Sequence, residues 1–345
     1  MRHGDADPSE GLVALRWADG VLYALDQTAL PWREDRLELR SAADVAAAIR
    51  RLSIRGAPLI GVAGGYGVAL AVSADPSRDA LERACELLRG ARPTAVNLAA
   101  AVDRVREATL RAPGGAAATA ALAAALALHA EEERASAALA GHGAELLSGA
   151  RRILTHCNTG ALAAPGRGTA LAVVAELADR GLLEGVLVCE ARPLLQGARL
   201  TVYELERLGV AHELIVDAAA PGLIAAGAAD AVIVGCDRVA ANGDVVNKVG
   251  TYGLALAAGA AGVPFIVAGP TTSIDLDCAE GALIEIEERA EDEVRQAGRH
   301  LLTLPATRCR NPAFDLTPAG LVTALVTECG VARAPYADSI RALYR

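Results

Sequence analysis

Aromatic residues are scarce in this 345-residue chain and make up only 3% of it. Hydrophobic residues nevertheless account for 53%, which is enough for a sizeable core and indicates that few segments are disordered. That core must be built from Ala, Val, Leu and Ile, with close packing between backbones. The length allows one large domain or two of moderate size.

The chain also lacks an excess of basic residues. Its formal net charge is −9 with both signs interspersed, which argues against nucleic acid as the main partner because phosphate-backbone binding needs a basic face. The polar N-terminus contains no apolar signal core. The longest apolar stretches, 59–72 and 116–130, are rich in Ala and Gly and predict buried helices rather than membrane spans. We therefore expect a cytoplasmic protein with no membrane partner.

Paired cysteines are absent as well. The seven cysteines are scattered and odd in number, without a CxxC pair, which excludes an obvious zinc site or disulfide framework. No cluster of carboxylates and histidines has metal-ligand spacing. No GxGxxG follows the first strand of the second half and no P-loop is present, so a dinucleotide site is not indicated. We expect neither a metal nor another cofactor.

Lysine is the rarest basic residue. Of 33 basic residues, Lys248 alone is a lysine, and it lies in the segment NGDVVNKVGTY. One interpretation is the chance survival of a single lysine. The other is that position 248 needs a compact point charge rather than the planar fork of arginine. Both stay open at this point.

The first 150 residues read as a mostly helical N-terminal domain with a small β element. Two strand-like runs around Asp19 and Gly20 predict a hairpin. Ser41 is a plausible N-cap for a helix over 41–52. Apolar residues at helical spacing predict further helices over 79–90, 94–111 and 114–149.

Residues 151–345 read as a Rossmann-like domain with a parallel sheet, so the fold class is α/β. Short apolar runs alternate with helical segments, which predicts βαβ units. The predicted strands lie at 152–156, 185–190, 212–217, 231–235 and 264–269. Thr317 and Pro318 form a suitable N-cap and N1 pair, which predicts a helix over 317–328.

Polar side chains follow four of these strands. Cys157, Glu190, Asp217 and Asp237 lie at or just beyond strand ends, where open α/β sheets bind their ligands. Cys157 precedes an Asn-Thr-Gly turn, where loop amides can lower a thiol pKa. The simpler alternatives are packing for Cys157 and helix capping for Asp237.

Arginines stand beside glycine or proline at the start of apolar helices. Arg55, Arg92 and Arg192 each have this setting. Singly, each also fits a helix-end salt bridge. Arginine at a helix N-terminus is a ready anion site, and together with Lys248 the set suggests a bound phosphate.

Motifs spread from about residue 25 to 330 carry a resemblance to a known family. The most specific are HCNTG and DRVAANGD, and the others include IRGAPLIGVAGGYG, RPTAVNL, RPLLQGARLT and NPAFDLTPAGLV. With these motifs the chain resembles the methylthioribose-1-phosphate isomerases, which are aldose–ketose isomerases of methionine salvage. The same superfamily includes ribose-1,5-bisphosphate isomerases and the regulatory subunits of a translation-initiation exchange factor.

The resemblance implies a homodimer and a catalytic cysteine and aspartate, which fall on Cys157 and Asp237. The candidates for binding the phosphate and hydroxyls of a sugar phosphate are Arg55, Gly56, Ala57, Arg92, Gln196, Asn247 and Lys248. The sequence departs from the family pattern in having Ala99 and Ala100 in place of aromatic residues, Ala191 in place of Thr, and Cys236 in place of Ala. The first departure places the sugar's 5-substituent in question.

A phosphate on the anomeric carbon prevents simple ring opening. Our hypothesis is that Asp237, protonated in an apolar pocket, donates to the ring oxygen and Cys157 then moves the C2 proton. A hydride shift from C2 to C1 is the rival route. The alternative functions are isomerisation of 5-deoxyribose 1-phosphate or ribose 1,5-bisphosphate, and a regulatory role without catalysis.

Overall fold

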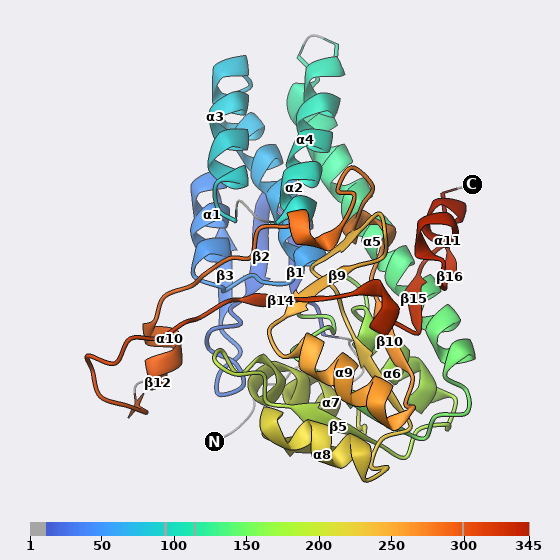
Figure 1. The fold of residues 1–345 in the computed structure, drawn as a ribbon. Coiled ribbons are helices and arrows are strands. Elements are labelled where there is room, and N and C mark those ends of the chain that lie inside the picture. Colours follow the sequence, from blue (N-terminus) through green and yellow to red (C-terminus); the bar gives the residue numbers. More distant parts are fainter. Residues whose placement is uncertain (1–11, 93–94, 114, 299, 345) are drawn as a thin grey trace.

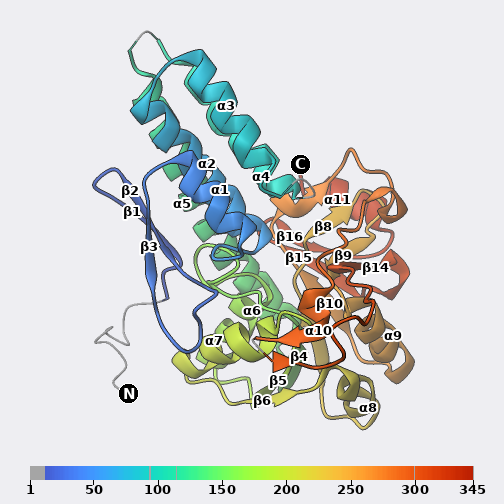
Figure 2. The same cartoon turned by 90° about the vertical axis from the view of Figure 1, so that its left-hand side faces the viewer.

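The structure, a computed structural model, describes residues 12–92, 95–113, 115–298 and 300–344. An upright group of helices stands beside a second part that contains a sheet with helices on both faces (Figure 1). The turned view shows the small N-terminal sheet on the outer side of the helices (Figure 2). The α/β fold class, with a helical N-terminal part and a parallel sheet, is confirmed.

The predicted hairpin is confirmed. Strands β1 (Leu15–Ala18) and β2 (Val21–Leu25) are antiparallel, and β3 (Arg36–Leu39) pairs with β2. Asp19 and Gly20 both have positive φ, 51° and 75°, as a two-residue hairpin turn of this twist requires.

Five helices make up the rest of the N-terminal part: α1 (Ala42–Arg50), α2 (Ala57–Ala74), α3 (Arg78–Arg89), α4 (Val96–Arg111) and α5 (Ala117–Leu146). Ser41 caps α1, because its side chain accepts a hydrogen bond from the Asp44 amide. By length and composition α2 is apolar enough to cross a membrane, but 83% of it is buried inside the protein. It packs against the other four helices and is the core helix of this layer. Helix α5 buries only part of its surface.

The large sheet has seven strands in the order β16-β15-β10-β7-β4-β5-β6. Six are parallel: β4 (Arg152–Thr155), β5 (Gly185–Cys189), β6 (His212–Ile215), β7 (Ala231–Val234), β10 (Phe265–Ala268) and β15 (Ala324–Thr327). Strand β16 (Gly330–Ala332) is an antiparallel edge. In chain order the six follow 3-2-1-4-5-6, which is the order of the doubly wound fold.

Alternate side chains of these strands enter two separate cores, as the period of a strand requires. One core lies under α5 and α6 (Ala170–Asp179), and the other under α8 (Ala220–Ala225), α9 (Thr251–Ala261) and α11 (Tyr336–Ala342). A π-helical turn (Gly197–Thr201) leads into α7 (Val202–Arg207) beyond β5.

A smaller sheet lies beyond the large one, with β8 (Arg238–Ala240), β9 (Val245–Lys248), β11 (Ile274–Asp275) and β14 (Phe314–Thr317). Helix α10 (Asp292–Arg295) and strands β12 (Gln296–Ala297) and β13 (His300–Leu301) form an arm that projects from the body (Figure 1). Single 3-10 turns complete the chain at Asp217–Ala219, Thr271–Ser273, Gly281–Leu283 and Ala319–Leu321.

The prediction of a helix over 317–328 is wrong. Thr317 ends strand β14, a 3-10 turn follows Pro318, and residues 324–327 form the fully buried strand β15. Strand β15 lies inside the sheet between β10 and β16. A short apolar run that is buried on every side has no polar face, so its periodicity does not distinguish a strand from a helix.

The predicted boundary at 150/151 falls between α5 and β4. Helix α5 belongs to both sides of it, because Ala121 and Ala125 pack in the core of the helical part, whereas Leu139 and Ala144 pack in the core of the sheet. The division into domains 1–150 and 151–345 therefore stays a prediction.

Candidate active site

The candidate site lies where the order of the sheet changes direction. Strands β4 and β7 are neighbours, but the chain leaves β4 toward β5 on one side and leaves β7 toward β10 on the other. The carboxyl ends of such a strand pair open a crevice that binds ligands in doubly wound folds. Cys157 follows β4 and Asp237 follows β7, so the two predicted catalytic residues flank this point.

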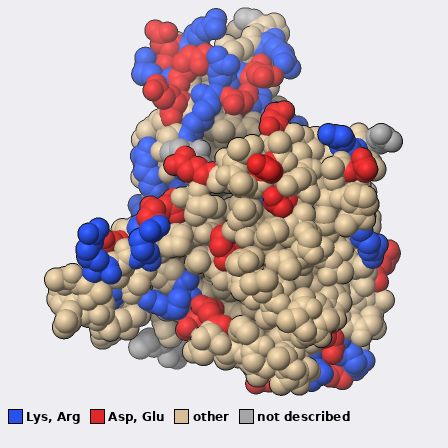
Figure 3. Space-filling model, in the orientation of Figure 1, with Lys and Arg blue, Asp and Glu red and all other residues tan. Residues whose placement is uncertain are grey.

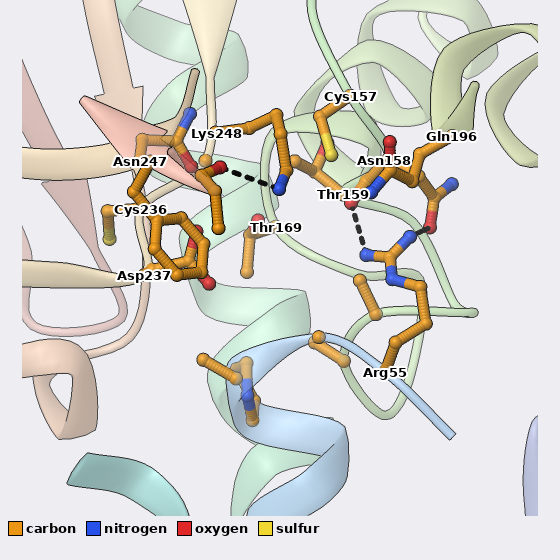
Figure 4. Close-up of a pocket in the computed structure, with 18 of the residues that line it drawn as sticks. Arg55, Cys157, Asn158, Thr159, Thr169, Gln196, Cys236, Asp237, Asn247 and Lys248 are labelled. Atoms are coloured by element: carbon orange, nitrogen blue, oxygen red, sulfur yellow. Dashed lines mark hydrogen bonds between the residues drawn. The ribbon is translucent and has the colours of Figure 1, made fainter. Parts of the chain in front are cut away.

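One pocket contains all nine of the residues proposed from sequence: Arg55, Gly56, Ala57, Arg92, Cys157, Gln196, Asp237, Asn247 and Lys248. Its volume is about 760 Å³, including the part that opens to solvent. Figure 4 shows Cys157 and Gln196 entering from one side, Asp237 and Asn247 from the opposite side, and Lys248 between them. These nine residues are up to 193 positions apart in the sequence (248 − 55).

Glu190 and Asp217 do not line this pocket, so only two of the four strands supply it with the polar groups expected from sequence. The Asp217 carboxylate accepts hydrogen bonds from the amides of Ala191 and Arg192, both at 2.8 Å. The Arg192 guanidinium donates to the carbonyl of Val294 at 2.8 Å. Asp217 and Arg192 therefore shape the loop after β5 instead of binding a pocket ligand.

Cys157 is held in an unusual backbone conformation. Its φ is 64°, a region that costs a residue with a side chain about 1–3 kcal/mol unless its surroundings hold it there. The Thr201 hydroxyl donates to the Cys157 carbonyl at 2.5 Å. The side chain is 8% exposed and faces the pocket (Figure 4). Strain of this kind at a residue that faces a cavity is typical of functional sites.

The environment of Asp237 suits a general acid. Burial raises the pKa of its carboxyl group, and the positive charges of Lys248, Arg92 and Arg55 oppose that rise. The protonated form is thereby favoured relative to a carboxyl group in water. A buried carboxylic acid that faces a ligand can donate a proton to it.

Lys248 is also buried, with 8% of its surface exposed. Its ammonium group donates to the Ala313 carbonyl at 2.7 Å and lies 4.7 Å from the centre of the Phe314 ring. Burial lowers the pKa of Lys248, whereas the charges of Cys157 and Asp237 raise it. The His156 ring donates to the Val249 carbonyl at 2.8 Å, which ties the loop that carries Cys157 to the end of the strand that carries Lys248.

The pocket holds two kinds of cation. Arg92 pairs with Glu287 at 2.8 Å, and Arg289 pairs with Glu287 at 2.9 Å and with Glu293. Arg55 instead donates to the side chain and the carbonyl of Asn158, at 2.7 and 2.8 Å. Within the described residues neither Arg55 nor Lys248 has a carboxylate partner within ion-pair distance. These two charges are available to an anionic ligand.

The start of α2 completes the anion site. A Cβ atom on Gly56, whose φ is 92°, would lie 2.3 Å from the carbonyl oxygen of Ala163. Only glycine lets the helix begin so close to the loop after β4, and this contact brings the positive end of α2 to the pocket. Gln196 contributes a buried side-chain oxygen that has no hydrogen-bond partner among the described residues, so it can accept a hydrogen bond from a ligand hydroxyl group.

Sequence reasoning missed several pocket residues. Asn158 directly follows Cys157 in the HCNTG motif, which is a signal that could have identified it. Arg289, Leu52, Leu194 and Phe314 also line the pocket, but apolar residues and a paired arginine carry no local signal. Ala99 and Ala100 are not among the residues that line it.

The chain matches the model of the "Initiation factor 2 subunit family" over residues 53–334. The chain belongs to this family. A "Methylthioribose-1-phosphate isomerase" of Parasynechococcus marenigrum is 47% identical to it over 96% of this chain and 97% of that protein. A "5-deoxyribose 1-phosphate isomerase" of Moorella thermoacetica is 44% identical over 96% and 97%.

Two solved structures are similar to the chain along its whole length. The 5-methylthioribose 1-phosphate isomerase of Pyrococcus horikoshii has a TM-score of 0.90 and 35% identity, covering 98% of this chain and 97% of that one. A protein of A. fulgidus, named as the translation initiation factor eIF-2B, subunit delta, has a TM-score of 0.85 and 37% identity, covering 96% of this chain and 99% of that one. The resemblance seen in the sequence motifs is confirmed by these relatives.

The anion site predicts that inorganic phosphate slows the alkylation of Cys157 by iodoacetamide. We expect protection of at least about threefold in wild type, and its loss in Lys248→Met or Arg55→Gln, because a charge-assisted contact to the anion disappears. Mass spectrometry of the Cys157 peptide measures the rate. Arg89→Gln is the matched control, since Arg89 pairs with Asp103 and does not line the pocket. Equal protection in all four proteins would contradict the site.

Proposed function

We propose that the protein is an aldose–ketose isomerase that converts 5-methylthioribose 1-phosphate to 5-methylthioribulose 1-phosphate. The observation that carries this proposal is the presence in one pocket of a thiol, a carboxyl group with a raised pKa and two cations that have no carboxylate partner among the described residues. The names of the Parasynechococcus and Pyrococcus relatives support the same reaction.

The groups in the pocket can open a sugar ring that carries a phosphate on its anomeric carbon. Asp237 donates its proton to the ring oxygen, which breaks the bond between that oxygen and C1. Cys157, as thiolate, removes the C2 proton, so that an enol forms between C1 and C2. The thiol then returns the proton to C1, and the C2 hydroxyl proton passes to the Asp237 carboxylate as the ketone forms. Both protein groups end in their starting states. A hydride shift, the rival route, would leave solvent hydrogen out of C1.

The charge balance of the pocket favours a substrate with one phosphate. Arg55, Lys248 and the start of α2 provide one anion site, whereas Arg92 and Arg289 are already neutralised by Glu287 and Glu293. A second phosphate, as in ribose 1,5-bisphosphate, would find no further unpaired cation among the described residues that line this pocket. Leu52 and Leu194 provide apolar wall at the mouth, which suits an uncharged 5-substituent.

The second candidate is 5-deoxyribose 1-phosphate, which the Moorella relative supports. It shares the single phosphate and an apolar 5-substituent, so the same pocket accommodates it. A regulatory role without catalysis is the less favoured reading, because Cys157 and Asp237 face one pocket together.

We also propose that the protein is a cytoplasmic homodimer. A broad face over α8 and α9 is nearly free of charged side chains (Figure 3), and neither helix contains a charged residue. Tyr252 and Leu256 on α9 are 41% and 44% exposed, a composition that suits an interface core.

We expect sedimentation to give twice the mass of the 35.3 kDa chain, and a monomer mass would contradict this assembly.

We predict that Cys157→Ser and Asp237→Asn each lower kcat by at least about two orders of magnitude, the typical contribution of a well-placed acid or base. Both variants remain close in shape to the native side chains, so we expect far-ultraviolet circular dichroism to be unchanged. Cys236→Ala is the control, because it removes a neighbouring pocket thiol that has no role in this mechanism. Near-normal turnover in both catalytic variants would exclude the proposed roles.

The proposed function also predicts how kcat/KM ranks among three sugar phosphates. We expect kcat/KM to be highest for 5-methylthioribose 1-phosphate, lower for 5-deoxyribose 1-phosphate, because less apolar surface is buried, and at least about 100-fold lower for ribose 1,5-bisphosphate. Side-by-side assays of ketose formation measure this order. A preference for the bisphosphate would contradict a pocket with a single anion site.

A further inference from the structure

A buried carboxylate lies directly beneath the loop that carries Cys157. Glu204, on α7, is 4% exposed, and the groups around its two oxygens are hydrogen-bond donors. It accepts from the Asn158 side-chain amide at 2.7 Å, from the Ala161 backbone amide at 2.7 Å and from the Leu162 backbone amide at 3.5 Å. A carboxylate in this position fixes the backbone of residues 158–162.

The same contacts extend to the groups that face the pocket. The Asn158 side chain that donates to Glu204 also accepts from Arg55 at 2.7 Å. Thr201, one turn before Glu204, accepts from Asn158 at 3.3 Å and donates to the Cys157 carbonyl. Glu204 is therefore connected to Arg55 through one side chain and to the strained backbone of Cys157 through two.

Gly160 shows how closely the loop and the carboxylate fit. A Cβ atom at position 160 would lie 2.2 Å from a Glu204 carboxylate oxygen. The glycine of the HCNTG motif is thus explained by the approach of Glu204, because its φ does not lie in the left-handed region. The Glu204 carboxylate thus fills the space that a side chain at position 160 would need.

We propose that ionised Glu204 is the positioning residue of this active site, which holds Cys157 and Arg55 in their working geometry through Asn158 and Thr201. The proposal rests on the proposed isomerase function. Glu204 touches no pocket ligand, since it does not line the pocket. Its effect on turnover passes through the residues that do.

The ionised form is required because the neighbours of Glu204 are donors. Protonation would place an O–H group against the amides of Asn158, Ala161 and Leu162, and at least one hydrogen bond would be lost. Burial raises the pKa of Glu204 to about 7, and the donors together with the Arg55 charge, which faces it from the start of α2, oppose this rise. The Cys157 thiol is the other titratable group of the loop. The positioning contact is thus present above about pH 7 and is lost as the pH falls below it.

The test compares Glu204→Gln with wild type across pH 5.5 to 9. The glutamine is permanently uncharged, so it imitates the protonated acid. We expect the ratio of wild-type to variant kcat/KM to be at least about tenfold at pH 8.5, as for lost charge-assisted hydrogen bonds, and to fall toward one below pH 6. Glu204 is the titratable group in which the two proteins differ, so a pH-dependent ratio reports on its ionised form.

Glu206→Gln is the matched control, because Glu206 lies on the same helix with 75% of its side chain exposed, and we expect its ratio to stay near one. A ratio for Glu204→Gln that is constant with pH, or that is near one at pH 8.5, would overturn the proposal. If Glu204→Gln does not fold, Thr201→Val is measured instead. About a tenfold loss of kcat supports positioning of Cys157 through Thr201, and a normal kcat overturns it. Wild-type turnover in the same assay tests the isomerase function separately.

Discussion

The pairing of β4 with β7 is the constraint on which the site depends. These two parallel strands lie side by side, with Leu154 opposite Val232, yet their chains depart to opposite sides of the sheet. The two connections diverge from the carboxyl ends of the pair, and a crevice opens between them. Cys157 and Asp237 occupy its two walls. The helical part closes it from the third side, with Arg55 and the start of α2.

Burial then gives these groups their chemistry. The same withdrawal from water raises the pKa of Asp237 and lowers that of Lys248, so both charged forms become more costly than in solvent. A phosphate dianion would restore the balance by compensating Lys248 and Arg55. This explains how a chain with a net charge of −9 can hold an anion: the relevant charge is local, and the carboxylates of Glu287 and Glu293 are already paired with Arg92 and Arg289.

The local elements were predictable because their signals are local. The Asp19–Gly20 turn and the Ser41 cap are set by a few neighbouring residues, and both are confirmed. The convergence of polar groups was only half predictable, since the sequence does not contain the strand order. Glu190 and Asp217 lie just beyond β5 and β6, and these strands are to one side of β4, away from the β4–β7 crevice. The role of Glu204 was not predictable from the sequence for a similar reason, because its side chain contacts residues more than 40 positions away.

The scarcity of lysine has a consequence for how this protein can be chemically marked. Arginine side chains do not react with ordinary acyl donors at neutral pH. Lys248 is therefore the one side-chain amine of the chain that could be acylated. That amine is enclosed and bonded to Ala313. An acyl group on this amine would therefore occupy the pocket, and modification of Lys248 and binding of an anion beside it would exclude each other.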